Sequence, residues 1–195
     1  MKHGSWNTAR AWGVRVKIGL YGGAFNPIHV NHLKVMAHAL AVGNLDRIWV
    51  LPAWQHAFGK DMTPFNTRVD WVTMAVGQVF GWGNRVQVMT CERHYQTTYT
   101  VDLVENLLRD YPEDKFSLIL GQDNLDVASK WHRWDDLTKM IEILAVPDQG
   151  PVRATVIRQA LAEGRYEDVA GMVPSTVLRD IKDTGTFFAP PKEKA

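Results

Sequence analysis

The stretch from residue 16 to residue 33, VKIGLYGGAFNPIHVNHL, constrains the fold of this chain more than any other. An apolar run typical of a strand ends at Gly22 and Gly23, a short loop follows, and a helical apolar pattern opens at His29. Two glycines let a ligand approach the backbone closely, and the free amide groups at a helix N-terminus attract anions such as phosphate. The stretch therefore predicts a strand, a glycine turn and a helix that together bind an anion.

The rest of the chain continues this alternation of strands and helices. Short apolar runs predict strands at 47–53, 86–90, 116–120 and 141–146, and helical patterns predict helices at 63–81 and 98–111 and from Thr155 and Pro174. Strands that alternate with helices form a parallel sheet covered on both faces. We therefore predict a single α/β domain over residues 1–195, a Rossmann-like doubly wound parallel sheet. Residues 1–15 would be an N-terminal extension and residues 190–195 a flexible tail.

The composition narrows the class of ligand and the compartment. Cys91 is the only cysteine, which excludes a disulfide framework and a CxxC-type zinc site and fits a reducing cytoplasm. The net charge of +1 lacks the basic excess that is typical of proteins that bind nucleic acid. The sequence has neither a signal-peptide core nor a membrane-spanning apolar run. We expect a cytoplasmic protein with small-molecule ligands and no nucleic-acid or membrane partner, and the sequence leaves homo-oligomer formation open.

His29 and His32 stand three residues apart at the start of the predicted helix. Side chains at this spacing lie on one side of a helix, so both imidazoles could reach the same phosphate. A bare HxxH pair is more often an ordinary surface pair, and as a zinc site it would lack cysteine partners and an obvious third ligand. The surrounding residues therefore decide what the pair does.

The segment GGAFNPIHVNHL resembles the signature GG(T/S)F(D/N)PxHxGH of the HxGH nucleotidyltransferases, and most closely their nicotinate mononucleotide adenylyltransferase branch. Asn31 stands where that signature has a glycine. The resemblance implies that His29 and His32 are catalytic and hydrogen-bond phosphate groups. It also implies ATP contacts by four residues of the same stretch, Gly22, Gly23, Phe25 and Asn26.

Two further stretches match the mononucleotide-binding motifs of this family. The triplet TYT at 98–100 is similar to the SYT segment, although an ordinary helix cap explains it equally well. The residues GQD at 121–123 and WHRW at 131–134 resemble GxD and WHxW, which implies that Asp123 binds ribose hydroxyls and Trp131 stacks on a pyridine ring. A carboxylate suits a cis-diol and an indole suits a flat ring whatever the family. The mononucleotide site that the resemblance implies is Thr98, Tyr99, Asp123 and Trp131.

Residues 152–158, VRATVIR, resemble the closing motif (I/V)S(S/A)TxIR, which holds the triphosphate of ATP at a helix N-terminus. Thr155 and Arg158 match this motif. Arg153 replaces its serine, and the guanidinium would either add a phosphate contact or point to solvent. The preceding segment at 147–151 is shorter than in many relatives. Lys60 is a further candidate for a phosphate contact, as is His56, although a solvated loop position explains either side chain equally well.

The resemblance implies direct transfer of AMP from ATP to nicotinate mononucleotide, with release of pyrophosphate and formation of the dinucleotide precursor of NAD. Arg158 would hold the β and γ phosphates, and Mg²⁺ would bridge phosphate oxygens through water rather than a protein carboxylate cage. The acceptor could instead be nicotinamide mononucleotide or another phosphate such as phosphopantetheine. A non-catalytic nucleotide-binding protein on the same fold is the other alternative. A redox enzyme is disfavoured, because GGxFNPxH differs from the GxGxxG fingerprint of dinucleotide binding.

Overall fold

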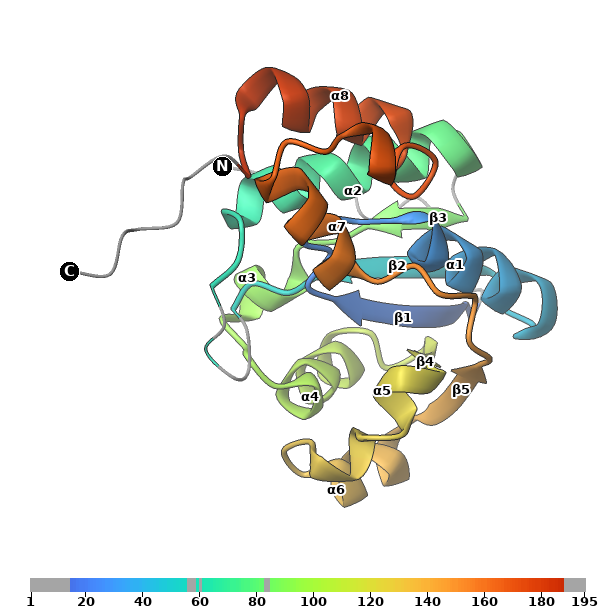
Figure 1. Ribbon diagram of the computed structural model, residues 1–195. Helices are drawn as coiled ribbons and strands as arrows, with labels where there is room; N and C mark the ends of the chain where they lie inside the picture. The colour runs from blue at the N-terminus through green and yellow to red at the C-terminus, as the bar shows by residue number, and fades with distance from the viewer. Residues whose placement is uncertain (1–14, 56–58, 60, 83–84, 188–195) are drawn as a thin grey trace, which may run out of the picture.

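The computed structural model describes residues 15–55, 59, 61–82 and 85–187 of the chain. Within these residues, five parallel strands form one sheet in the order β3-β2-β1-β4-β5 (Figure 1). The strands are β1 (Lys17–Gly23), β2 (Arg47–Pro52), β3 (Val86–Val88), β4 (Lys115–Gly121) and β5 (Glu142–Val146). The chain builds outward from β1 to β3, then returns to the other side of β1 and builds outward again to β5. This order confirms the predicted doubly wound parallel sheet.

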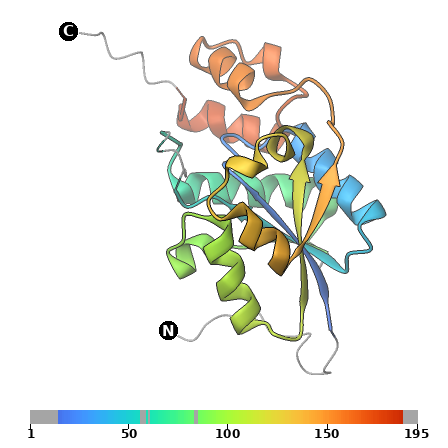
Figure 2. The ribbon, with the colours of Figure 1, turned by 90° about the horizontal axis from the view of Figure 1, so that it is seen from below.

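Helices cover both faces of the sheet. One face is covered by α1 (Val30–Val42), α2 (Phe65–Phe80), α7 (Ala154–Ala162) and α8 (Ser175–Thr184), with a 3₁₀ turn at Glu167–Val169. The other face is covered by α3 (Cys91–Tyr95), α4 (Thr100–Asp110) and α6 (Trp134–Met140), with the short α5 (Gln122–Leu125) and a 3₁₀ turn at Ala128–Lys130 beside them. Figure 2 looks at the molecule from the side of α4 and α6.

The strands read as continuous apolar runs because both of their faces are buried. Successive side chains of a strand point to opposite faces. In β2, Ile48 and Val50 pack into the core beneath α1 and α2, whereas Trp49 and Leu51 pack into the core beneath α4. Strand burial on both faces is characteristic of parallel sheets, and it explains why apolar runs located the strands correctly.

Several short helical segments were not predicted from the sequence. The expected strand at 86–90 ends at Val88, and α3 begins directly after it at Cys91. The segments α5 and α6 and the 3₁₀ turn between them lie between β4 and β5, where no helix was predicted. Elements this short span too few turns to show a 3.6-residue apolar repeat. The predicted extension at 1–15, apart from Arg15, and the predicted tail at 190–195 lie outside the described residues.

No helix in the described part of the chain combines the length and apolar character that a membrane crossing requires.

Arg68, on α2, connects the loops that follow β1 and β2. Its side chain is almost fully buried, with 1% of its surface exposed, and it donates to the carbonyl oxygens of Ala24 (2.8 Å), Ala53 (2.7 Å) and Thr63 (2.8 Å). Buried carbonyl groups without a partner are costly, so one guanidinium satisfies three loop groups at once. This arginine fixes the loops at the carboxyl ends of the two strands.

Replacing Arg68 should therefore destabilise the fold. Arg68→Met leaves three carbonyls unpaired, and we expect the free energy of unfolding to fall by about 3 kcal/mol. Urea unfolding followed by circular dichroism measures this change. The matched control is Arg109→Met, since Arg109 is exposed and forms an ion pair with its neighbour Asp110 at the surface; it should change stability by less than about 0.5 kcal/mol. Equal effects of the two substitutions would contradict the role of Arg68.

Candidate active site

The candidate site lies at the carboxyl ends of β1 and β4, where the order of strands reverses. Ligands of open α/β sheets bind at such a switch point. Gly22 is the second-to-last residue of β1, and Gly121 ends β4. A Cβ built on either glycine would meet no atom within 4 Å, so the space above both strands is open. The adjacent pocket is lined by His29, His32, Asp123 and other residues from the loops that follow β1, β4 and β5.

The two histidines stack on each other at the start of α1. His29 is the N-cap residue, and its ring centroid lies 3.7 Å from that of His32 with an interplanar angle of 25°. The backbone amide of His29 donates to Nδ1 of His32 at 3.1 Å. Because Nδ1 accepts this bond, neutral His32 carries its proton on Nε2. The edge of the Phe25 ring, 5.0 Å away between centroids, fixes the His32 ring in place.

Both imidazoles are neutral near pH 7. Burial, together with the positive charge of Arg153, lowers the pKa of His29 to about 4. Removal from water also lowers the pKa of His32 well below its usual value, and the proximity of His29 adds to this effect. Neutral imidazoles donate hydrogen bonds through N–H, and an anionic ligand placed against them would raise both pKa values. The pair therefore suits a polyanion.

Two of the predicted ATP-site residues, Asn26 and Thr155, both contact Arg158. Arg158, on α7, donates from Nη1 to the carbonyl oxygen of Asn26 at 2.9 Å and from Nη2 to Oγ1 of Thr155 at 3.2 Å. Asn26 is itself buried, and its Oδ1 accepts from the backbone amide of Thr63 at 3.4 Å. Contacts between the first and last motifs of the chain thus bring Asn26, Thr155 and Arg158 together. Lys60 and His56 lie outside the described residues.

The predicted mononucleotide residues lie at the N-terminus of α4 and around α5 and α6. Tyr99 is the N-cap residue of α4, and its ring centroid lies 4.4 Å from that of His132. Thr98 Oγ1 donates to Gln55 Oε1 at 3.4 Å. Trp131 packs edge to face against Trp134, with 6.0 Å between ring centroids. The fold therefore brings the TYT and WHRW segments together, and His132 is a contact that its sequence position alone did not single out.

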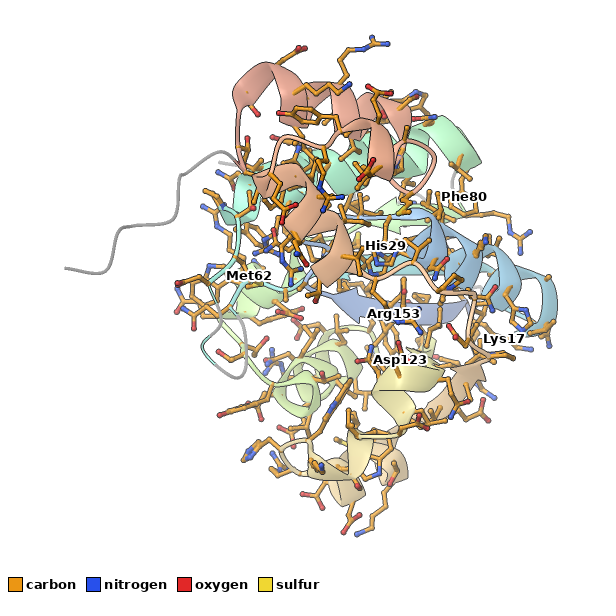
Figure 3. The ribbon with its side chains drawn as sticks, in the orientation of Figure 1. Lys17, His29, Met62, Phe80, Asp123 and Arg153 are labelled. Atoms are coloured by element: carbon orange, nitrogen blue, oxygen red, sulfur yellow. The ribbon has the colours of Figure 1, made fainter. Side chains whose placement is uncertain are left out.

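Asp123 is held by a residue from the opposite wall of the pocket. The carboxylate Oδ2 of Asp123 lies 3.0 Å from Nε of Arg153, and Figure 3 shows these side chains next to His29. The side chain of Arg153 is 40% exposed. The sequence left this arginine either on a phosphate or in solvent, and the structure places it on Asp123 instead.

Two further residues near the site were missed by the sequence analysis as functional candidates. Asn31 is buried on α1, and its Nδ2 donates to the carbonyl oxygens of Gly150 at 2.7 Å and Val152 at 3.0 Å. Burial raises the pKa of Glu92 to about 7, and its Oε2 accepts from the backbone amide of Trp54 at 2.9 Å. The only sequence signal for Asn31 was its departure from the glycine of the motif; Glu92 gave none.

The described residues contain no group of three or more His, Cys, Asp or Glu side chains that could hold a metal ion. Asp123 and Asp148 are carboxylates in the pocket wall, and Arg153 pairs with both.

Stacked histidines at a helix start, at the switch point of a parallel sheet, are the arrangement that the nucleotidyltransferase motifs predict for this class of protein. A family model described as Cytidylyltransferase-like matches residues 20–180, and the chain belongs to this family. The match spans β1 through most of α8, which includes every motif used above. The resemblance seen in the sequence is thereby confirmed.

Relatives cover most of the chain. It is 35% identical over 186 residues to a protein of Anaeromyxobacter dehalogenans (strain 2CP-1) described as a probable nicotinate-nucleotide adenylyltransferase. The matched region covers 88% of this chain and 96% of the relative. It is 26% identical over 190 residues to the nicotinate-nucleotide adenylyltransferase of Bacillus subtilis, with 88% and 98% covered. The nicotinic acid mononucleotide adenylyltransferase of Plasmodium falciparum complexed with NaAD has a TM-score of 0.76 at 17% identity, covering 89% and 98%, and it supports the fold alone.

Lowering the pH should destabilise the protein through its paired histidines. Because the folded-state pKa values lie below 6.5, the usual value, the unfolded chain binds more protons at acidic pH, and stability present above pH 6.5 is lost as the pH falls towards 4. Each histidine can contribute a slope of up to about 1.4 kcal/mol per pH unit. We expect His32→Gln to show a shallower loss of unfolding free energy between pH 7 and pH 5, measured by urea unfolding.

Glu92 contributes with the opposite sign, since burial raises its pKa to about 7. The quantity to compare is therefore the difference in slope between His32→Gln and the parent protein, in which the contribution of Glu92 cancels. Identical slopes in the two proteins would contradict the lowered pKa of His32.

Proposed function

We propose that the chain transfers AMP from ATP to nicotinate mononucleotide and releases pyrophosphate. It is a nicotinate-nucleotide adenylyltransferase, as are the relatives that match it over most of its length. The observation that carries the proposal is the contact between the first and last motifs: Arg158 donates to the carbonyl oxygen of Asn26, in the loop that leads from β1 to the stacked histidines. Such N–H donors suit the negative charge of a triphosphate.

The chemistry is a direct displacement at phosphorus. An oxygen of the mononucleotide phosphate forms a bond to the α-phosphorus of ATP while the bond from that phosphorus to the bridging oxygen of the leaving pyrophosphate breaks. No covalent enzyme intermediate is needed, so catalysis consists of positioning and of stabilising charge on the phosphoryl oxygens. His29 and His32 supply N–H donors in a site poor in water, where such bonds are stronger than in bulk solvent.

Arg158 would hold the β and γ phosphates beside the N-terminus of α7. Two of its N–H groups are used on Asn26 and Thr155, which fix the plane of the guanidinium. An arginine has five N–H donors, so others remain for phosphate oxygens. Thr155 lies in the first turn of α7, where free backbone amides favour an anion. Lys60 is a further candidate contact on the strength of its sequence position alone.

Mg²⁺ would reach the site bound to the phosphates of ATP. The pocket carboxylates of Asp123 and Asp148 are engaged by Arg153, which leaves phosphate oxygens and water as the natural ligands. The ion would neutralise charge on the departing pyrophosphate, a role that the protein shares through Arg158.

Nicotinate is the better acceptor because its carboxylate suits the start of α4. This helix has no side-chain cap at Tyr99, so its first amides and its positive dipole end are available to an anion. Trp131 would stack on the pyridine ring, and Thr98 would lie near the carboxylate. Nicotinamide carries no charge and would gain nothing from the helix dipole.

The proposal is tested by pyrophosphate release with Mg²⁺ and ATP, measured in parallel with nicotinate mononucleotide, nicotinamide mononucleotide, phosphopantetheine and no acceptor. We expect release with nicotinate mononucleotide to be fastest and to fall by about a hundredfold in His32→Ala. Preference for another acceptor would contradict the substrate assignment. Binding of ATP without release for any acceptor would indicate a non-catalytic nucleotide-binding protein.

Removing the clamp on the triphosphate should weaken ATP binding. We expect Arg158→Met to raise the KM for ATP about tenfold and to lower kcat, because charge on the leaving group is no longer neutralised. The matched control is Arg165→Met, since Arg165 follows α7 and pairs with Glu163 and Asp168 away from the pocket. An unchanged KM for ATP in Arg158→Met would contradict the role of this arginine.

A further inference from the structure

The two residues that depart from the family motifs donate hydrogen bonds to the same pair of backbone carbonyl groups. Asn31 replaces a glycine on α1, and Arg153 replaces a serine before α7. Asn31 Nδ2 donates to the carbonyl oxygens of Gly150 and Val152, and Arg153 Nη1 donates to the same two oxygens. In the sequence, Asn31 and Arg153 are two separate departures from the motifs. In the fold, both side chains bind the same pair of carbonyl groups.

The guanidinium of Arg153 is fully committed to protein partners. Its Nη1 binds the two carbonyls, and its Nη2 lies 3.3 Å from the carboxylate of Asp148. Its Nε lies 3.0 Å from Oδ2 of Asp123. A planar guanidinium held along all of its edges has a fixed orientation and few donors left for a phosphate. This argues against a direct phosphate contact and for an effect through Asp123.

Asp123 keeps acceptor capacity while its orientation is fixed. Arg153 engages Oδ2, and the side chain of Asp123 remains 66% exposed at the pocket wall. An ionised carboxylate has about four lone-pair sites, so those on Oδ1 remain free for hydroxyl groups. The charge of Arg153 also acts on His29, whose pKa it lowers together with burial, which places the arginine in the same pocket as the catalytic pair.

We propose that Arg153 is a positioning residue that aims the Asp123 carboxylate at the cis-diol of a substrate ribose, and that Asn31 orients Arg153 by holding the carbonyls of Gly150 and Val152. The proposal rests on the function proposed above. Both ATP and nicotinate mononucleotide carry a ribose with a cis-diol, and the Asp123 carboxylate suits either diol. The chemistry recognised is the diol itself, and the experiment identifies which of the two riboses supplies it.

The test compares kcat/KM for substrates with and without the diol. Pyrophosphate release is measured with ATP or 2′,3′-dideoxy-ATP, and with nicotinate mononucleotide or its 2′,3′-dideoxy analogue. We expect Arg153→Ser to lower kcat/KM about tenfold for the natural pair, in line with a lost charge-assisted hydrogen bond. In the arm that lacks the relevant diol, the same substitution should change kcat/KM by less than about twofold. The substrate pair whose kcat/KM is insensitive to Arg153→Ser identifies the ribose that Asp123 binds.

Other outcomes overturn the proposal. An equal loss in every arm would mean that Arg153 contacts phosphate directly, and no loss with the natural pair would mean that it has no role. Absence of turnover by the parent protein would instead contradict the proposed function. Arg109→Ser, on an exposed part of α4, serves as the control and should leave all arms unchanged. Arg153→Lys retains the charge without the planar fork, so it should behave like Arg153→Ser if orientation matters.

The role of Asn31 is tested by combining substitutions. Asn31→Gly restores the residue of the family motif and removes the two hydrogen bonds that Asn31 donates to the carbonyls of Gly150 and Val152. If Asn31 acts through Arg153, Asn31→Gly should show the same dependence on the diol, and the double variant with Arg153→Ser should be no worse than Arg153→Ser alone. Additive losses in the double variant would overturn this part, and thermal unfolding of each variant verifies that it is folded.

Discussion

The pairing of β1 with β2 on one side and β4 on the other is the constraint on which the rest of the structure depends. It makes β1 the central strand, buried on both faces, and it places the reversal of strand order between β1 and β4. The connections that leave these two strands turn to opposite faces of the sheet, so the space above Gly22 and Gly121 stays open. The helix that follows β1 then directs its N-terminus and both histidines at this space.

Arginines bound to backbone carbonyls hold the irregular segments around the site. Arg68 joins the loops after β1 and β2, Arg158 joins α7 to the loop after β1, and Arg153 binds the segment before α7. Loops carry both amide and carbonyl groups that need partners. When arginines satisfy the carbonyl groups, the amide groups remain available to an anionic ligand. The same bonds fix the orientation of the arginine side chains before any substrate binds.

The extent to which the sequence predicted the structure follows from the length of each element. The strands at 116–120 and 141–146 and the helices α2 and α4 are long and strongly patterned, and each was predicted within a few residues. The helices α3, α5 and α6 were missed because five or so residues cannot display a helical repeat. Within the site, the matched motifs named His29, Asn26 and Arg158, but the neutral state of the histidines depends on burial, which no local pattern reveals.

The sequence by itself determined the class of fold, the family and the candidate residues His29, His32 and Asp123 of the pocket, because apolar periodicity and the order of motifs are properties of the chain. Only the tertiary structure decided how those residues pair. Asn31 and Arg153 are far apart in the sequence, and each looked like an isolated departure from a motif. Their shared carbonyl groups and the bond from Arg153 to Asp123 arise where α1, α5 and the start of α7 meet. Hydrogen bonds and ion pairs act over a few ångströms in space, and the folded chain sets those distances.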